Sequence, residues 1–349
     1  GKNLSLEGNG SATVTGSGCT YTVVADQGEQ LNLSGLTIDH TYGRGISAQN
    51  SNTSIVLDNV SILSIGANSW DGSAIYASGA SVTITNSEIS NMSSSRGAIF
   101  LEDFASLTIE DSIFDSNDAL NGGVVYAEND TTVIIEGSSF VGNSTRTGGF
   151  GAVATVRYDS AITVSNSTFT GNSSGSYAGA LYVEQGQSVN GITQLTVTDS
   201  IFENSSAINA GGAIYVKNRV DVEISNTTFN ANQGAIGGAV FLTSIDGTAN
   251  IDNCTFTNNS TDLSNGGDGG ALAALGGGST SPSNILINQS TFSGNTAKTY
   301  GGAVSVGSPY NQSKHGSLTV TGSSFSSNTA LSSQSGVGGA IYHLSLIHI

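Results

Sequence analysis

The stretch STFSGNTAKTYGGAV, residues 290–304, joins a Ser-x-Phe-x-x-Asn group to a Gly-Gly-Ala-Val group through a few polar residues. The same two groups recur in the same order along most of the chain of 349 residues. The first inward apolar residues of the successive copies are Val82, Leu107, Val133, Ile162, Leu195, Val222, Ala249, Ile285 and Leu318. The residues seven positions later are Ile89, Phe114, Phe140, Phe169, Phe202, Phe229, Phe256, Phe292 and Phe325. The register never slips, so the repeat is the organising feature of the chain.

The residues between these anchors predict two short strands joined by a tight corner. Alternation of apolar and polar residues with a period of two favours strand over helix. A turn former, usually Asn, Asp or Gly, stands four positions after the first apolar residue, as at Asn166, and predicts a left-handed backbone there; Gln289 is the poorest fit. We expect the Asn166 side chain to point inward. An Asn stands three positions after most of the Phe residues, as Asn295 after Phe292, with Met92 and Ser205 as departures. It predicts a ladder of buried amides that hydrogen-bond to one another.

The Gly-Gly-Ala group predicts a third strand, with small residues where another wall passes close by. Three strands in about 25 to 35 residues are typical of one coil of a parallel β-helix. We therefore predict an all-β, single-stranded right-handed parallel β-helix of about 12 coils, a solenoid with three short strands per coil. We expect one domain over residues 1–349, with less regular coils in residues 1–70 and an off-pattern tail at residues 343–349.

Repeated Gly-Gly-Ala followed by Ile, Leu or Val, together with repeated Phe-x-x-Asn, resembles the repeats of the chlamydial polymorphic outer-membrane proteins. It also resembles parallel β-helix repeat proteins with a pectin-lyase-like fold, from about Ser73 to Tyr342. The resemblance implies a surface-exposed, adhesin-like protein. We therefore predict a non-enzymatic structural glycoprotein, extracellular or on the cell surface. Its expected partners are a host-cell, matrix or glycan ligand, or other copies of itself or related surface proteins, including assembly into filaments.

The charge balance excludes two classes of partner. The chain has 26 acidic and 9 basic residues, a formal net charge of −17. Such a surface repels phosphate backbones and anionic lipids, so we expect no nucleic-acid partner. No apolar run approaches the roughly 20 residues that cross a bilayer, so we expect no direct membrane insertion. Cys19 and Cys254 lie far apart and give no disulfide framework.

The runner-up hypothesis is a carbohydrate-active β-helix enzyme, either a polysaccharide lyase or a glycoside hydrolase. A lyase needs an Arg or Lys base, and a hydrolase needs two carboxylates about 5 to 10 Å apart. The sequence has no Asp-Asp pair, its nine basic residues are scattered, and its best mixed cluster is residues 39–44. We therefore predict no catalytic residue, no cofactor and no metal site. Three or more carboxylates or basic groups converging in an outer groove would favour the enzyme.

An ice-binding protein is a third hypothesis, because a flat β-helix wall with regular Thr ranks can order water. The relevant outward column begins with Thr83 and Thr108. It is interrupted by Glu223, Asn250 and Leu286, which disfavours a regular ice-binding plane.

Function in a β-helix is expected in the loops, which tolerate insertion while the coils fix their positions. The loop GSPYNQSKHG, residues 307–316, has the richest recognition chemistry. The predicted ligand-binding residues are Tyr310, Asn311, Lys314 and His315. Glycosylation is expected at Asn129 and Asn311, which look more accessible than Asn166.

The chain end departs from the repeat. The run HLSLIHI, residues 343–349, has neither the corner Asn nor the Phe. We expect either a truncated sequence with a tail foreign to the gene, or a bare end that pairs with another chain.

Overall fold

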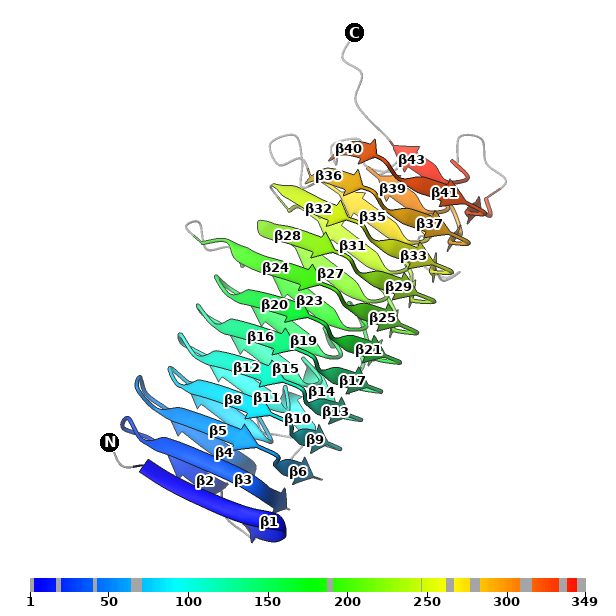
Figure 1. The fold of residues 1–349 in the computed structure, drawn as a ribbon. Helices are drawn as coiled ribbons and strands as arrows, with labels where there is room; N and C mark the ends of the chain where they lie inside the picture. Colours follow the sequence, from blue (N-terminus) through cyan, green and yellow to red (C-terminus); the bar gives the residue numbers. More distant parts are fainter. Residues whose placement is uncertain are drawn as a thin grey trace.

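The computed structural model describes most of the chain and contains only strands, turns and connecting segments in that part. The described residues are 3–16, 20–39, 43–63, 71–186, 191–245, 247–261, 267–276, 283–307, 316–332 and 338–343. Strands from successive coils stack into three parallel sheets that run along one axis (Figure 1). Strand β1 lies at one end of the stack and strands β40, β41 and β43 at the other. No helix in these ranges is long and apolar enough to span a membrane.

Sheet 1 has 22 strands and holds the two strands on either side of the corner in each coil. Its strands are β1 (Asn3–Thr15), β3 (Gln30–Asp39), β5 (Ser54–Asp58), β6 (Ser61–Leu63), β8 (Ser81–Thr85), β9 (Glu88–Ser90), β12 (Ser106–Glu110), β13 (Ile113–Asp115), β16 (Thr132–Glu136), β17 (Ser139–Val141), β20 (Ala161–Ser165), β21 (Thr168–Thr170), β24 (Thr193–Thr198), β25 (Ile201–Glu203), β28 (Val220–Ser225), β29 (Thr228–Asn230), β32 (Thr248–Asp252), β33 (Thr255–Thr257), β36 (Ser283–Asn288), β37 (Thr291–Ser293), β40 (Gly316–Thr321) and β41 (Ser324–Ser326).

Sheet 2 has nine short strands and sheet 3 has twelve. Sheet 2 comprises β10 (Ser93–Arg96), β14 (Asp118–Asn121), β18 (Ser144–Thr145), β22 (Ser173–Ser174), β26 (Ser206–Ala207), β30 (Gln233–Gly234), β34 (Ser260–Thr261), β38 (Thr296–Ala297) and β42 (Thr329–Ala330). Sheet 3 comprises β2 (Tyr21–Ala25), β4 (Arg44–Gln49), β7 (Ile75–Ser78), β11 (Ile99–Glu102), β15 (Val125–Glu128), β19 (Ala154–Arg157), β23 (Leu181–Glu184), β27 (Ile214–Lys217), β31 (Val240–Thr243), β35 (Leu272–Leu275), β39 (Val304–Val306) and β43 (Ile341–His343). The predicted right-handed parallel β-helix is confirmed.

The Phe column is the centre of the core, as the repeat predicts. Phe140 pairs with Phe169 in register, and Phe169 pairs with Phe202. The ring centroids of the first pair lie 4.9 Å apart and those of the second pair 4.4 Å, with nearly parallel planes. These rings are fully buried. Like residues stack on like because each strand hydrogen-bonds to its own copy in the neighbouring coils.

The Phe-x-x-Asn ladder is also confirmed. Asn117 Nδ2 donates to Asn143 Oδ1 at 3.0 Å, and Asn143 Nδ2 donates to Asn172 Oδ1 at 3.0 Å. All three side chains are fully buried. Each amide therefore satisfies the next one in a place that water does not reach.

The corner residue has the predicted left-handed backbone, but its side chain points outward. The backbone φ is 48° at Asn166 and 48° at Gln289, in the left-handed region. Asn166 is exposed, so the expectation of an inward side chain is wrong. The next residue is the inward one: Ser138 N donates to Ser167 Oγ at 3.1 Å. A strand that turns through a single left-handed residue places that residue on the outside of the bend.

The Gly-Gly-Ala groups are small because backbones pass close to them. A Cβ atom added to Gly123 would lie 2.1 Å from the carbonyl oxygen of Ala152 in the next coil. Gly122, with φ 60°, provides the left-handed turn that enters the strand. This agrees with the predicted close approach of another wall.

Candidate functional site

The outward face of sheet 3 carries two parallel columns of side chains. In β15, Val125 and Ala127 belong to the core, so strand alternation turns Tyr126 and Glu128 outward. The first column contains Tyr76, Phe100, Tyr126, Thr155, Tyr182, Tyr215, Phe241, Ala273, Ser305 and Tyr342. The second column contains Ser78, Glu102, Glu128, Arg157, Glu184, Lys217, Thr243 and Leu275. One column is aromatic for most of its length, and the other carries charge.

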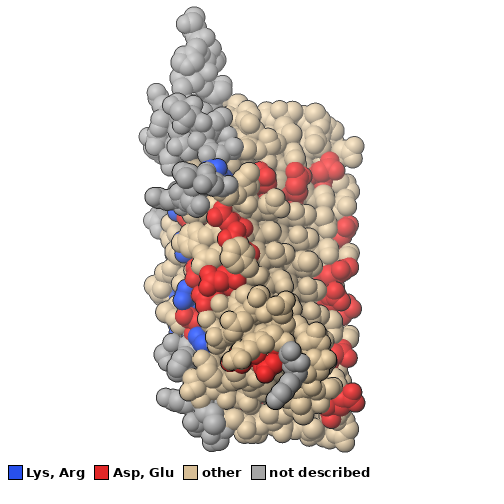
Figure 2. Space-filling view, turned by 90° about the vertical axis from the view of Figure 1, so that its left-hand side faces the viewer, with Lys and Arg blue, Asp and Glu red and all other residues tan. Residues whose placement is uncertain are grey.

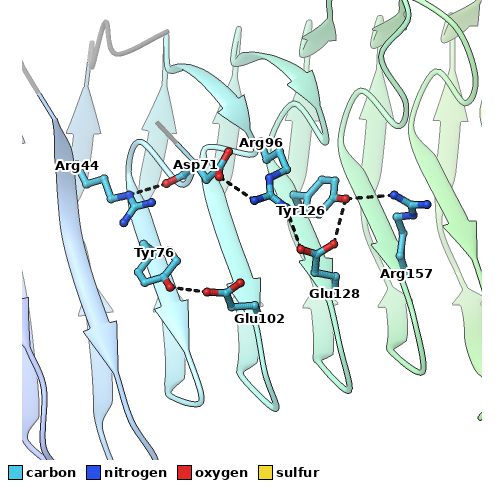
Figure 3. A network of polar contacts seen from close by, with 8 residues as sticks. All are labelled: Arg44, Asp71, Tyr76, Arg96, Glu102, Tyr126, Glu128 and Arg157. Carbon is cyan, nitrogen blue, oxygen red and sulfur yellow. Dashed lines mark hydrogen bonds and ion pairs between the residues drawn. The ribbon is translucent and has the colours of Figure 1, made fainter. Parts of the chain in front are cut away.

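Arg96 joins the charged column from the end of β10. Its Nη1 atom lies 2.8 Å from Glu128 Oε1, and its Nη2 atom lies 2.8 Å from Asp71 Oδ2. Its guanidinium group also lies 4.4 Å from the centre of the Phe100 ring. Two carboxylates and a ring face therefore hold the group in place. Figure 3 shows the contacts of Arg96 with Asp71 and Glu128.

Arg157 connects the neighbouring coils of the same column. Its Nη1 atom donates to the Tyr126 hydroxyl at 3.3 Å, and its Nη2 atom lies 3.0 Å from Glu184 Oε2. The Tyr126 hydroxyl in turn donates to Glu128 Oε2 at 3.2 Å. Figure 3 shows this path from Glu128 through Tyr126 to Arg157. The path links two carboxylates that are two coils apart.

Glu184 is the most enclosed carboxylate of the column, at 7% exposed. Lys217 Nζ lies 2.9 Å from its Oε1 atom, and the Tyr182 hydroxyl donates to its Oε2 atom at 2.9 Å. At the other end of the column, the Tyr76 hydroxyl donates to Glu102. The same hydroxyl-to-carboxylate pairing therefore recurs along the face.

A fourth cation of the outer face of sheet 3 is Arg44, at the start of β4. Its Nε atom donates to the backbone oxygen of Asp71 at 2.7 Å, and its guanidinium lies 4.1 Å from the centre of the Tyr76 ring. We call the following set the outer-face network: Arg44, Asp71, Tyr76, Arg96, Glu102, Tyr126, Glu128, Arg157, Tyr182, Glu184 and Lys217. Its four cations balance its four carboxylates in formal charge.

The protonation of the network follows from its burial and its contacts. Burial raises the pKa of Tyr126, and burial together with the Glu184 charge raises the pKa of Tyr182. Burial lowers the pKa of Arg157, but the hydrogen bond to Tyr126 and the charge of Glu184 outweigh it and leave that pKa above its usual value. At neutral pH the phenols are therefore neutral proton donors, and Arg157 is a fixed positive charge.

The network corrects one expectation drawn from the sequence. Figure 2 shows Lys and Arg side chains in a line along one edge of its view, with Asp and Glu side chains between them. The basic residues of this line are not scattered, because residues one coil apart along the chain become neighbours on one face. Carboxylates and basic groups thus converge on the outer face of sheet 3.

The signal for this network lies in the repeat itself. Three segments illustrate this: GVVYAE (residues 123–128), GALYVE (179–184) and GAIYVK (212–217). In each segment, the residues three and five positions after the opening Gly point outward. The third strand was predicted from its inward small residues alone. Arg96 and Asp71 come from other segments, and no motif connects them to the column.

The sequence-predicted site residues lie elsewhere. Tyr310, Asn311, Lys314 and His315 lie outside the described residues, so their role in binding stays a prediction. Asn129 is exposed in a turn, with φ 63°, and its glycosylation also stays a prediction. Within the described part of the chain, no three His, Cys, Asp or Glu side chains come together as ligands for one metal ion.

Comparison with known proteins identifies the class of the chain. A family model described as the right-handed beta helix region matches residues 4–169, 107–286 and 154–346. These matches span nearly the whole sequence, so the chain belongs to this family. No curated protein matches the sequence.

A solved structure is similar to the chain over nearly its full length. It is the A-module of the mannuronan C-5 epimerase AlgE4 of Azotobacter vinelandii, with a TM-score of 0.53 and 13% sequence identity. The match covers 99% of this chain and 91% of that one. At this identity the likeness shows the fold. The prediction of a non-enzymatic protein is corrected, because an enzyme has this fold and acidic and basic side chains do come together on the outer face of sheet 3.

Proposed function

We propose that the chain is a carbohydrate-active enzyme that hydrolyses glycosidic bonds of a polysaccharide lying across the outer face of sheet 3. One observation carries the proposal: Glu128 and Glu184 occupy the same outward column two coils apart, with Arg157 between them. Their Cα atoms are thus separated by about 10 Å, twice the spacing of neighbouring strands. This Cα spacing is close to the separation of about 6.5 to 9.5 Å between the two carboxyl groups of inverting glycosidases.

The contacts of the two carboxyl groups suggest different roles. Both oxygens of Glu184 face a cation, Lys217 on one side and Arg157 on the other. Only one oxygen of Glu128 faces a cation: its Oε1 atom pairs with Arg96, while its Oε2 atom accepts from the Tyr126 hydroxyl. We therefore assign Glu128 as the proton donor to the leaving oxygen and Glu184 as the base that orients water. Arg157 holds the two in register.

Hydrolysis fits the network better than elimination. A lyase base must be deprotonated when it attacks, and the raised pKa values of Arg96 and Arg157 keep both groups charged. The four cations are also balanced by four carboxylates, so little positive charge remains to hold a polyuronate. These two points favour an uncharged polysaccharide and acid–base hydrolysis. An extracellular or cell-surface location stays a prediction that would place this face in reach of such polymers.

The test is release of new reducing ends from a panel of neutral and acidic polysaccharides, with ultraviolet absorbance recorded to detect unsaturated lyase products. Glu128→Gln and Glu184→Gln should each lower turnover at least about 100-fold, as expected for removal of an acid or base. Glu136→Gln is the matched control, because Glu136 is exposed at the end of β16 in sheet 1. Far-ultraviolet circular dichroism checks that each variant folds.

Three results would count against the proposal. The first is the absence of reducing ends from every neutral polysaccharide in the panel. The second is unsaturated product in place of reducing ends alone, which would identify a lyase. The third is turnover that survives both substitutions, which would remove Glu128 and Glu184 from the chemistry.

A further inference from the structure

The aromatic column of sheet 3 is interrupted at Ala273, two coils beyond Lys217 at the end of the outer-face network. Tyr215 pairs in register with Phe241, and their ring centroids lie 5.3 Å apart. The next residues of the column are Ala273 and then Ser305. The side of the Phe241 ring that faces Ala273 therefore has no stacked ring from this column. The stack of rings ends here with a small residue in place of the next aromatic.

A hollow of about 340 Å³ lies against the last two rings of this stack, Tyr215 and Phe241. Its lining comprises Tyr177, Asn209, Ala210, Tyr215, Ile236, Phe241, Thr243 and Leu275. We call this the apolar hollow. None of its lining residues carries a formal charge at neutral pH, although the whole chain has a net charge of −17. The hollow therefore combines aromatic and aliphatic surfaces with a few hydroxyl and amide groups.

The apolar hollow is continuous with the outer-face network. Thr243 follows Lys217 in the charged column, and Lys217 follows Glu184. Thr243 thus lies two coils from Glu184, about 10 Å along the axis at the usual strand spacing. An oligosaccharide that contacts Glu184 and extends along the axis reaches the hollow.

We infer that the apolar hollow is a subsite for an uncharged sugar ring of the polysaccharide bound at the network, an inference that rests on the proposed function. A pyranose ring has apolar C–H faces and hydroxyl edges, which match ring surfaces beside the Asn209 amide and the Thr243 hydroxyl. A hollow of about 340 Å³ lies at the small end of ligand sites and suits one such ring.

The lining also selects against a charged sugar. A uronate carboxylate placed in the hollow loses water and finds no cation among the lining residues. The closest cation of the charged column is Lys217, which already pairs with Glu184 at 2.9 Å. The subsite therefore specifies a neutral sugar at this position of the polysaccharide.

The inference is tested by changing the ring stack that borders the hollow. Ala273→Phe places a ring next to Phe241, which lines the hollow. Binding is measured by calorimetry in the Glu128→Gln background, which blocks turnover. The probes are linear hexasaccharides of glucose, mannose and xylose, with hexamannuronate and hexagalacturonate as charged counterparts. Ala273→Phe should weaken binding of the tightest neutral hexasaccharide by about tenfold or more, equivalent to about 1.4 kcal/mol.

Two further variants make the result independent of one substitution. Phe241→Ala removes the ring face and should weaken the same hexasaccharide by a similar factor, even where Ala273→Phe disturbs folding. Ile134→Phe adds a ring to the exposed face of sheet 1 and serves as the control, since Ile134 is 39% exposed there. The control should bind as tightly as the parent.

The outcomes separate this inference from the proposed function. Unchanged affinity in both hollow variants, or uronate hexasaccharides that bind as tightly as neutral ones, would overturn the subsite even where Glu128 and Glu184 are needed for hydrolysis. Failure of every neutral hexasaccharide to bind would overturn it as well. A neutral hexasaccharide could bind, with affinity lowered in both hollow variants, while the native chain hydrolyses no polysaccharide. That result would support the subsite and overturn the proposed hydrolysis.

Discussion

Replacement of one ladder asparagine should lower the free energy of unfolding by several kcal/mol. Asn259 is fully buried, and its side chain makes four hydrogen bonds. Its Nδ2 atom donates to Phe229 O at 2.9 Å and to Asn295 Oδ1 at 3.0 Å. Its Oδ1 atom accepts from Asn232 N and Asn232 Nδ2, both at 3.0 Å. Asn259→Ala removes all four bonds and leaves the partners buried.

The magnitude follows from the number of bonds. At a net value of about 1 kcal/mol for each buried hydrogen bond, the loss is about 4 kcal/mol. Water that enters the vacated space and pairs with the stranded groups would reduce the loss to about 2 kcal/mol. We therefore expect Asn259→Ala to lower the free energy of unfolding by about 2 to 4 kcal/mol.

The chain contains its own complementary variant. Ser205 occupies a ladder position, its hydroxyl has no hydrogen-bond partner, and its backbone N donates to Asn232 Oδ1 at 3.0 Å. Ser205→Asn would continue the ladder, and we expect a gain of about 1 kcal/mol.

The assay is urea unfolding followed by far-ultraviolet circular dichroism, with hydrogen exchange of the Asn232 amide as a local measure that does not assume two-state unfolding. Exchange at Asn232 should accelerate at least about tenfold in Asn259→Ala. A stability loss below about 1 kcal/mol together with unchanged exchange would refute the account of a hydrogen-bonded ladder.

Two other predictions concern titration and thiol reactivity. Burial and the Glu102 contact raise the pKa of Tyr76 from 10.0 to about 12. Folding therefore favours the neutral phenol, so its contribution to stability is complete below pH 10 and is lost as pH rises toward 12. Tyr76→Phe should make the unfolding free energy fall less steeply across that interval, and an unchanged slope would contradict this. Burial raises the pKa of the Cys254 thiol from 9.0 to about 11, which keeps the thiol protonated at neutral pH. In a Cys19→Ser variant, where Cys254 is the remaining cysteine, a thiol reagent should therefore modify Cys254 only as fast as the protein opens. Rapid modification of the folded protein would show that Cys254 is accessible.

The repeat predicted the coil because its evidence is local and redundant. Phe at one strand position and Asn three residues later recur through many copies, and stacking requires like positions to meet. The predicted inward direction of the Asn166 side chain was wrong, because a left-handed φ restricts the backbone but does not determine which side of the bend faces the core. Ser167, one residue later, is the inward member.

The two outward columns of sheet 3 can be predicted from the sequence, but the outer-face network cannot. Once Val125 and Ala127 are inward, strand alternation turns Tyr126 and Glu128 outward. Alternation says nothing about Arg96, which enters from sheet 2, or about Asp71, which lies in a connecting segment. The distances of these groups from Glu128 depend on how three walls close around the core.

The sequence by itself determined the coil, the stacked Phe and Asn columns and the strong excess of negative charge, because each depends on residue type at a repeated position. The way the walls close around the core places cations that are far apart in the chain on one face with paired carboxylates, and forms the hollow that Phe241 lines. The physical reason is that stacking brings residues about one coil apart in sequence to within a strand spacing, so the chemistry of a face belongs to the column and not to any local motif.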